Sequence, residues 1–343
     1  MRALLVILPL LLCAACAVSP LPLPPPAYDA DQLLARRTIG LDPRPYRDEK
    51  YWLNPDMVMR HFVDFSTEYT DPEQIPFTLL KSLREEWPAR KYRRDANFSA
   101  ADAFHEQQAN CLSYSAMVVS LMRHAGVRAR FQRVEAAPEW DLEGSSVVAA
   151  LHINAVIFLQ GKQVEVDWLP RRNPSDYERR FILSDDQALA EWHNNLGAEA
   201  LLNDDLPLAF AELSRALRLS PDAAHIWVNL GVIYRRLRLD DYAESAWLIA
   251  IEHDNRQLQA MSNLQRLYAG RGEQDLAGDL NSLILHYRKK NPYYYYLLAQ
   301  QAESESRYDD ALRHIQRARR MHEDLRFDSL LARLYERLNE PSS

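Results

Sequence analysis

A repeat of 34 residues that begins near residue 190 constrains the fold of this chain more than any other feature. The tripeptide at Asn195–Gly197 recurs at Asn229–Gly231, and its first two residues recur again at Asn263–Gln265. Paired alanines recur with the same period, first as Ala209 and Ala216 and then as Ala243 and Ala250. A period of this length predicts stacked supersecondary units that bury their apolar faces against one another.

The residues inside each unit resemble those of the tetratricopeptide repeat. The second unit has the matching pattern of large and small side chains at Trp227, Leu230, Gly231 and Tyr234. The third unit is about three residues longer, up to Asn291, and a fourth is marked by Leu298, Ala299, Tyr308, Ala311 and Ala318. The resemblance implies an all-α solenoid over residues 190–339, with four helix pairs, a capping helix and a concave groove for a protein or peptide partner.

Three asparagines share one position of this repeat: Asn195, Asn229 and Asn263. They are predicted to form a ladder along the inner face of the solenoid. An asparagine amide both donates and accepts hydrogen bonds, so the ladder is a candidate site for the backbone of a bound peptide. The alternative is that asparagine is simply common at this position.

Ahead of the repeats, the stretch from Asn110 to Phe131 predicts a helix followed by a strand. Asn110 is a natural N-cap, and Gly126 fits the position after the helix. Cys111 then lies in the first turn, where unpaired backbone N–H groups and the helix dipole favour a thiolate. The helix is apolar on most sides, which predicts that it is buried. A buried, inert cysteine is the alternative interpretation.

Two β-runs further on supply partners for this cysteine. Val147–Leu159 contains His152, Val164–Leu169 contains Asp167, and Gln160-Gly161 predicts a hairpin turn between the runs. A two-residue loop pairs Leu159 with Lys162 and places His152 diagonal to Asp167 on one face of the sheet, within reach of side chains. A three-residue loop would put them on opposite faces.

These residues predict thiol catalysis of acyl transfer. His152 would take the proton of Cys111, and Asp167 would orient the imidazole and stabilise its charged form. The backbone N–H of Cys111 is a candidate oxyanion donor, and the candidates for a second donor are Gln107, Gln108 and Trp87.

The order of these motifs resembles the transglutaminase-like superfamily, whose core is papain-like. The resemblance rests on Ala103-Phe104, Asn110–Ala116, Ala125–Gln132, His152–Asn154 and Val166–Trp168. It implies an α+β domain over residues 29–186 with Cys111, His152 and Asp167 as its triad, and no metal or cofactor. The implied activity is attack on a peptide or glutamine amide, followed by transfer of the acyl group to water or an amine. Inactive copies occur in the family, so a catalytically inactive adaptor that binds proteins through its repeats is the alternative.

The first part of this domain reads as helices that wall a core. Apolar residues at helical spacing predict helices over residues 29–35, 55–65 and 76–83, and a capping box predicts one over 99–104. Asn54 is predicted to be the N-cap of the second of these, with Pro55 at its first position.

The N-terminus reads as an export signal. Arg2 precedes an apolar run that is too short to span a bilayer, and Cys13-Ala-Ala-Cys16 resembles a bacterial lipobox, with Cys13 where leucine is usual. The resemblance implies a signal peptide over residues 1–15, a lipid on Cys16 and an outer-membrane lipoprotein that faces the periplasm. A proline-rich linker follows over residues 16–28. Plain secretion with cleavage after Ala15 or Ala17 is the alternative.

Composition and the absence of certain motifs argue against several other classes of protein function. The formal net charge of −7 argues against nucleic acid as a partner. The sequence contains neither an H-E-x-x-H motif nor a Gly-rich phosphate loop, which argues against a metal or nucleotide enzyme. Of the three cysteines, Cys13 and Cys16 belong to the export signal, so Cys111 would be the one free thiol and has no disulfide partner within the chain.

Overall fold

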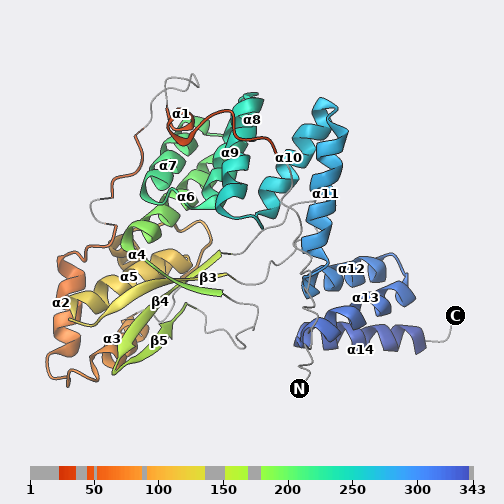
Figure 1. Cartoon of the computed structure of the whole chain (residues 1–343). Helices are drawn as coiled ribbons and strands as arrows, with labels where there is room; N and C mark the ends of the chain where they lie inside the picture. Colours follow the sequence, from red (N-terminus) through yellow and green to blue (C-terminus); the bar gives the residue numbers. More distant parts are fainter. Residues whose placement is uncertain are drawn as a thin grey trace, which may run out of the picture.

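The computed structural model describes residues 23–35, 45–49, 52–86, 91–135, 151–168 and 179–339. Within these ranges an α+β domain precedes an array of helices (Figure 1). This is the predicted fold class. The predicted signal peptide, with Cys13 and Cys16, lies outside the described residues, and none of the described helices is long and apolar enough to cross a membrane.

The α+β domain packs helices against a four-stranded antiparallel sheet with the strand order β5-β4-β3-β6. Its helices are α2 (Met57–Thr67), α3 (Ile75–Glu86), α4 (Ala100–Glu106) and α5 (Cys111–His124). The strands of the sheet are β3 (Ala129–Glu135), β4 (Leu151–Leu159), β5 (Lys162–Val166) and β6 (Arg179–Leu183), and β1 (Lys91–Tyr92) pairs in parallel with β2 (Gln108–Ala109). The central helix α5 lies against β3 and β4, and Met117 and Phe131 are buried between them.

The predicted hairpin register is confirmed. Leu159 pairs with Lys162, so Gln160 and Gly161 form a two-residue turn. Their φ angles are +48° and +79°, as a type I′ turn requires, and glycine adopts the second without strain.

The predicted start of α2 is wrong. Asp56, not Asn54, is the N-cap, and its Oδ1 accepts a hydrogen bond from Met59 N at 2.9 Å. A carboxylate makes a stronger, charge-assisted bond to a helix N-terminus than an amide does. His105 also holds the other carboxylate oxygen, with 2.5 Å between Nε2 and Oδ2.

The helical region contains the four predicted helix pairs and the capping helix. Its elements are α6 (Asp185–Leu202), α7 (Leu206–Leu219), α8 (Ala224–Arg236), α9 (Asp240–His253), α10 (Leu258–Arg271), α11 (Gln274–Arg288), α12 (Pro292–Ser304), α13 (Tyr308–Met321) and α14 (Leu325–Asn339).

The four helix pairs do not form a single stack with one core. Helices α6–α11 share one hydrophobic core, whereas α12–α14 have a core of their own. Figure 1 shows these three helices as a separate group, joined to the others by α11. Two aromatic side chains of α12 face the capping helix: Tyr293 and Tyr296 contact Phe327 with ring centroids 5.2 and 5.3 Å apart.

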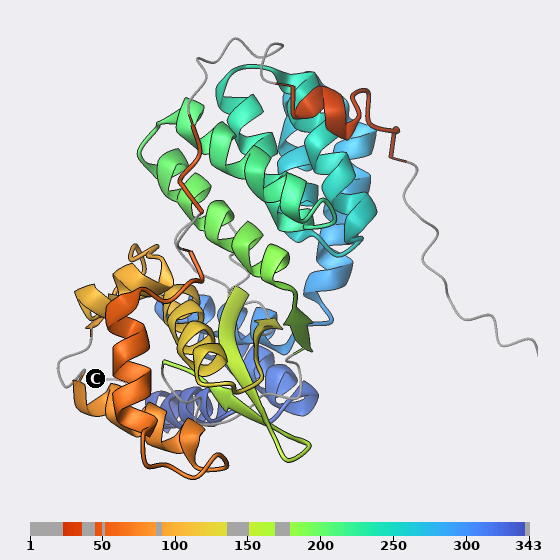
Figure 2. The same ribbon diagram turned by 90° about the vertical axis from the view of Figure 1, so that its left-hand side faces the viewer.

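Helix α6 belongs to two cores at once. Trp192 is buried in the α+β domain beside Trp52, whereas Ala190 and Leu201 are buried among the repeats. In Figure 2 the green first repeat lies directly above the sheet. The α+β domain and the repeats are therefore joined through a shared helix.

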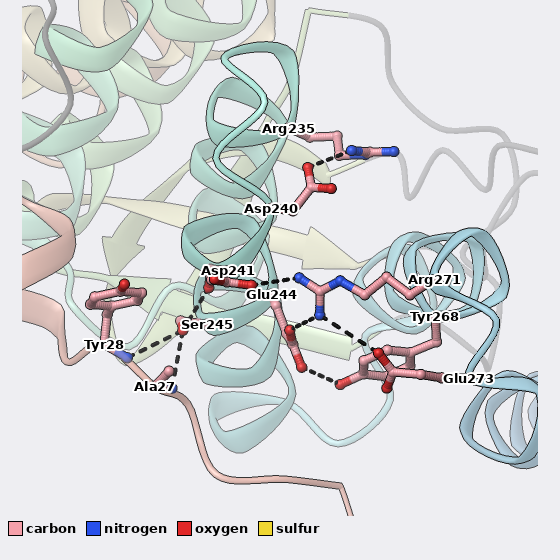
Figure 3. A network of polar contacts seen from close by, with 10 residues as sticks. All are labelled: Ala27, Tyr28, Arg235, Asp240, Asp241, Glu244, Ser245, Tyr268, Arg271 and Glu273. Atoms are coloured by element: carbon pink, nitrogen blue, oxygen red, sulfur yellow. Dashed lines mark hydrogen bonds and ion pairs between the residues drawn. The ribbon is translucent and has the colours of Figure 1, made fainter.

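The segment before the α+β domain packs on the repeats. The residues around α1 (Ala30–Leu33) lie against α9, where Ser245 Oγ accepts hydrogen bonds from Ala27 N and Tyr28 N at 3.1 and 3.2 Å (Figure 3). Tyr28 stacks on Tyr242 with ring centroids 4.1 Å apart, and Leu33 is fully buried in the repeat core. The domain boundary predicted at residue 29 thus falls in a segment that the repeats hold.

Polar contacts also join the second repeat to the third (Figure 3). Arg271 on α10 pairs with Asp241 and Glu244 on α9, with 2.7 Å between Arg271 Nη2 and Asp241 Oδ1. The Tyr268 hydroxyl donates to Glu244 Oε1 at 2.8 Å. These contacts tie α9 of the second unit to α10 of the third.

Gly231 is expected to be essential for the packing of the second repeat. An added Cβ would overlap the indole of Trp247, which is 2% exposed and donates from Nε1 to Val228 O at 3.1 Å. Gly231→Ala should therefore destabilise the chain by about 1–3 kcal/mol in urea denaturation followed by circular dichroism. Gly278→Ala is the matched control, because Gly278 lies at an exposed position of α11 where an added Cβ meets nothing within 4 Å. It should leave stability unchanged or raise it by up to about 1 kcal/mol, and equal losses in both variants would contradict the prediction.

Candidate active site

Cys111 is the first residue of α5, as predicted. The side chain of Asn110 caps the helix, since its Oδ1 accepts from Ser113 N at 2.8 Å, and Gly126 follows the helix with φ +75°. Cys111 itself is a free thiol and only partly buried, whereas Leu112 to Met122 are all buried. The sulfur thus lies at the accessible, electropositive end of an otherwise enclosed helix.

His152 and Asp167 come together as the register requires. His152 Nε2 lies 2.6 Å from Asp167 Oδ2, and the two side chains are 22% and 11% exposed. Asp167 directly follows β5, and extending the ladder by one step places it opposite Asn154. His152 is therefore its diagonal neighbour on the same face.

The pKa of His152 depends on both Asp167 and Cys111. Burial alone would lower the pKa of its imidazole, but the hydrogen bond to Asp167, the contact with Cys111 and the negative charge of both groups outweigh burial and raise the pKa to about 9. Because Nε2 faces Asp167, Nδ1 is the ring nitrogen left for Cys111. An imidazole that stays protonated at neutral pH stabilises a thiolate beside it.

Aromatic side chains surround this group. Trp168, which is 6% exposed, contacts Tyr114 edge-on and Tyr92, with ring centroids 5.1 and 6.1 Å apart. Burial raises the pKa of Tyr92, and the negative charges of Cys111 and Asp167 raise it further, which places the tyrosine beside the site. Sequence analysis missed Tyr92, because only the pairing of β1 with β2 brings it here.

Of the candidates for a second oxyanion donor, Gln107 donates to another group, and Gln108 accepts a hydrogen bond through its amide oxygen. Gln107 Nε2 donates to Glu86 O at 3.3 Å, and Gln108 Oε1 accepts from Arg93 Nη1 at 3.3 Å. Trp87 lies outside the described residues. The identity of the second donor stays a prediction.

The predicted asparagine ladder is only partly open to a ligand. Asn195, Asn229 and Asn263 are all half-buried, but Asn229 Nδ2 donates to Asn194 Oδ1 at 2.9 Å and Asn263 Oδ1 accepts from Arg266 Nη2 at 2.6 Å. A peptide would have to compete with these bonds. Among the described residues, no group of three or more His, Cys, Asp and Glu side chains is arranged to hold a metal ion.

A family comparison places a transglutaminase-like domain in this chain. Residues 63–170 match the model of the transglutaminase-like superfamily, a range that contains Cys111, His152 and Asp167. No curated protein sequence is significantly similar to the chain.

Solved structures give weaker matches. PilF from Pseudomonas aeruginosa is 15% identical, with 46% of this chain and 72% of that chain covered and a TM-score of 0.29. MamA from Desulfovibrio magneticus is 14% identical, with 46% and 88% covered and a TM-score of 0.28. A putative protease from Parabacteroides distasonis is 13% identical, with 36% and 26% covered and a TM-score of 0.28. At these scores the likenesses support no argument about function.

The pKa of His152 is expected to depend on Asp167. In Asp167→Asn the carboxylate charge is lost while burial still disfavours the imidazolium, so the pKa should fall from about 9 by about one unit or more. NMR titration of the His152 ring signals measures this value. Glu165→Gln is the matched control, because Glu165 lies on the same edge strand but pairs with Arg180. A pKa that stays near 9 in Asp167→Asn would refute the assigned interaction.

Proposed function

We propose that this chain is a thiol enzyme of the cell envelope that attacks a peptide or glutamine amide through Cys111. The observation that supports this most directly is the His152–Asp167 pair at 2.6 Å, held beside a cysteine at a capped helix N-terminus. The match to the transglutaminase-like superfamily supports the same chemistry.

The geometry suggests a two-step acyl transfer. The Cys111 thiolate attacks the amide carbon, and the developing oxyanion accepts a hydrogen bond from the Cys111 N–H. The protonated His152 gives its proton to the leaving nitrogen, so the C–N bond breaks and a thioester remains on Cys111. Water or an amine then attacks the thioester, His152 takes the proton of this nucleophile, and the thiolate is released. Asp167 stabilises the imidazolium at both stages.

The repeats are proposed to recruit a protein substrate or partner. Their first helix is part of the wall of the α+β domain, so a chain bound in the groove would be held near the active site. The same proposal places the chain at the outer membrane, facing the periplasm, through a lipid on Cys16.

Alkylation tests whether Cys111 is an activated thiol. The chain with Cys13→Ser and Cys16→Ser retains Cys111 as its only thiol and is treated with iodoacetamide from pH 5 to pH 10. An ordinary thiol has a pKa of about 8.5 and is less than about 1% ionised at pH 6. We expect rapid labelling at pH 6 because of the imidazolium, and a drop of at least about tenfold in His152→Ala.

His105→Ala serves as the control, because His105 pairs with Asp56, the N-cap of α2, rather than with the cysteine. A pH profile like that of a free cysteine, unchanged by His152→Ala, would instead indicate a catalytically inactive adaptor that acts through its repeats.

Lipidation is tested separately. Cys16→Ser is expected to abolish labelling of the chain by a radioactive or clickable fatty acid in a bacterial host, whereas Cys111→Ser should leave labelling intact. Continued labelling of Cys16→Ser would refute the anchor without bearing on the active site.

A further inference from the structure

We propose that Glu199, a residue of the repeat array, is a positioning residue for Cys111: through Asn97 it fixes the orientation of the amide that caps the nucleophile's helix. This inference rests on the proposed function, because it assigns a role in placing the proposed nucleophile. It concerns three side chains in series, one on α6, one in the loop before α4 and one at the start of α5.

The three side chains form a continuous hydrogen-bonded relay. Asn97 Nδ2 donates to Glu199 Oε2 at 2.9 Å, and Asn110 Nδ2 donates to Asn97 Oδ1 at 2.7 Å. The relay ends where Asn110 Oδ1 accepts from Ser113 N at 2.8 Å, which is the N-cap bond of α5. The nucleophile, Cys111, directly follows the capping residue.

The direction of the relay follows from the chemistry of its first member. An ionised carboxylate only accepts hydrogen bonds, whereas an asparagine amide donates at one end and accepts at the other. Glu199 therefore requires the NH₂ group of Asn97, which turns the Asn97 oxygen toward Asn110. That oxygen in turn requires the NH₂ group of Asn110 and leaves the Asn110 oxygen for Ser113 N.

The orientation of the two amides matters because both side chains are buried. Asn97 and Asn110 are 6% and 4% exposed, so solvent is largely excluded from replacing a lost partner. With Glu199 absent, the Asn97 NH₂ group loses its acceptor and its amide is free to turn over, which brings that NH₂ group against the NH₂ group of Asn110. Asn110 then loses the partner that holds its amide, so its cap bond to Ser113 N weakens and the first turn that holds Cys111 frays more readily.

The loop that carries Asn97 is itself held by the repeat helix. The Asn97 carbonyl accepts from Trp192 Nε1 on α6 and from Arg47 Nη1, each at 3.3 Å. Ser113 Oγ accepts from Phe98 N at 2.9 Å and so ties this loop to α5 as well. The backbone position of Asn97 is thus fixed from both sides, and the orientation of its amide is what depends on Glu199.

The test measures alkylation of Cys111 by iodoacetamide across pH, in the chain with Cys13→Ser and Cys16→Ser. Glu199→Ala should lower the rate constant at pH 6 by about fivefold, the factor expected from losing an N-cap. Glu199→Gln retains the side-chain volume and a carbonyl acceptor, so the rate constant should fall less in this variant. Asp186→Asn removes the same charge from an exposed position on α6 and should have no effect. Circular dichroism checks that each variant is folded.

A second background separates positioning from general stability. A serine hydroxyl rotates freely and caps a helix as well as asparagine does, so its capping does not depend on Asn97. In chains that carry Asn110→Ser, adding Glu199→Ala should therefore change the rate constant by less than about 1.5-fold. A fivefold loss that persists in this background would show that Glu199 acts by another route and would overturn the proposal.

The remaining outcomes are distinguishable. If Glu199→Ala matches Asp186→Asn while His152→Ala still slows labelling, the proposal fails and the proposed function survives. If labelling does not depend on His152, the proposed function fails, and hydrogen exchange at Ser113 N then decides on the relay. Faster exchange in Glu199→Ala than in Asp186→Asn would support the relay, and equal exchange would overturn it.

Discussion

The packing of one helix on two cores is the constraint on which the rest of this molecule depends. Helix α6 presents Trp192 to the α+β domain and Leu201 to the repeats, so neither core is complete without it. A polar cluster reinforces the junction: fully buried His193 lies between Glu212 Oε2 at 2.6 Å and Glu49 Oε1 at 2.9 Å. Both ring nitrogens of this buried histidine thus have a carboxylate partner, and loss of either side of the junction would leave a buried polar group without one.

A shared helix changes what a repeat array can do for a catalytic site. Domains joined by a flexible linker move independently, and a partner bound to one is held near the other only on average. Here Glu191 on α6 contacts both His225 on α8 and Arg133 on β3, with 2.9 Å between His225 Nε2 and Glu191 Oε2. The first repeat and the candidate active site are therefore in direct contact, and polar contacts from the repeats reach as far as Asn110, the cap of α5.

Local sequence rules predicted the parts of the site that depend on local geometry. The cap at Asn110, the glycine at Gly126 and the turn at Gln160-Gly161 each follow from one or two residues, and the turn set the register that pairs His152 with Asp167. The predictions that failed depend on competition between nearby residues or on contacts between residues far apart in the sequence. Pro55 favoured Asn54 as the cap of α2, and no local pattern shows that His105 approaches Asp56. Likewise, no repeat pattern shows that α12 packs on Phe327 or that Glu199 reaches Asn97.

The charge of His152 and the position of the proposed nucleophile, Cys111, are controlled by different parts of the molecule. Asp167 and Cys111 outweigh the cost of burial and raise the pKa of His152 from its ordinary value of 6.5 to about 9. A helix cap contributes about 1 kcal/mol and acts on the first turn of its own helix. The cap therefore bears on whether the first turn of α5 stays in place beside the imidazolium, and not on whether the imidazole is charged. The α+β sheet thus sets the chemistry, while the repeat helix sets where the sulfur lies.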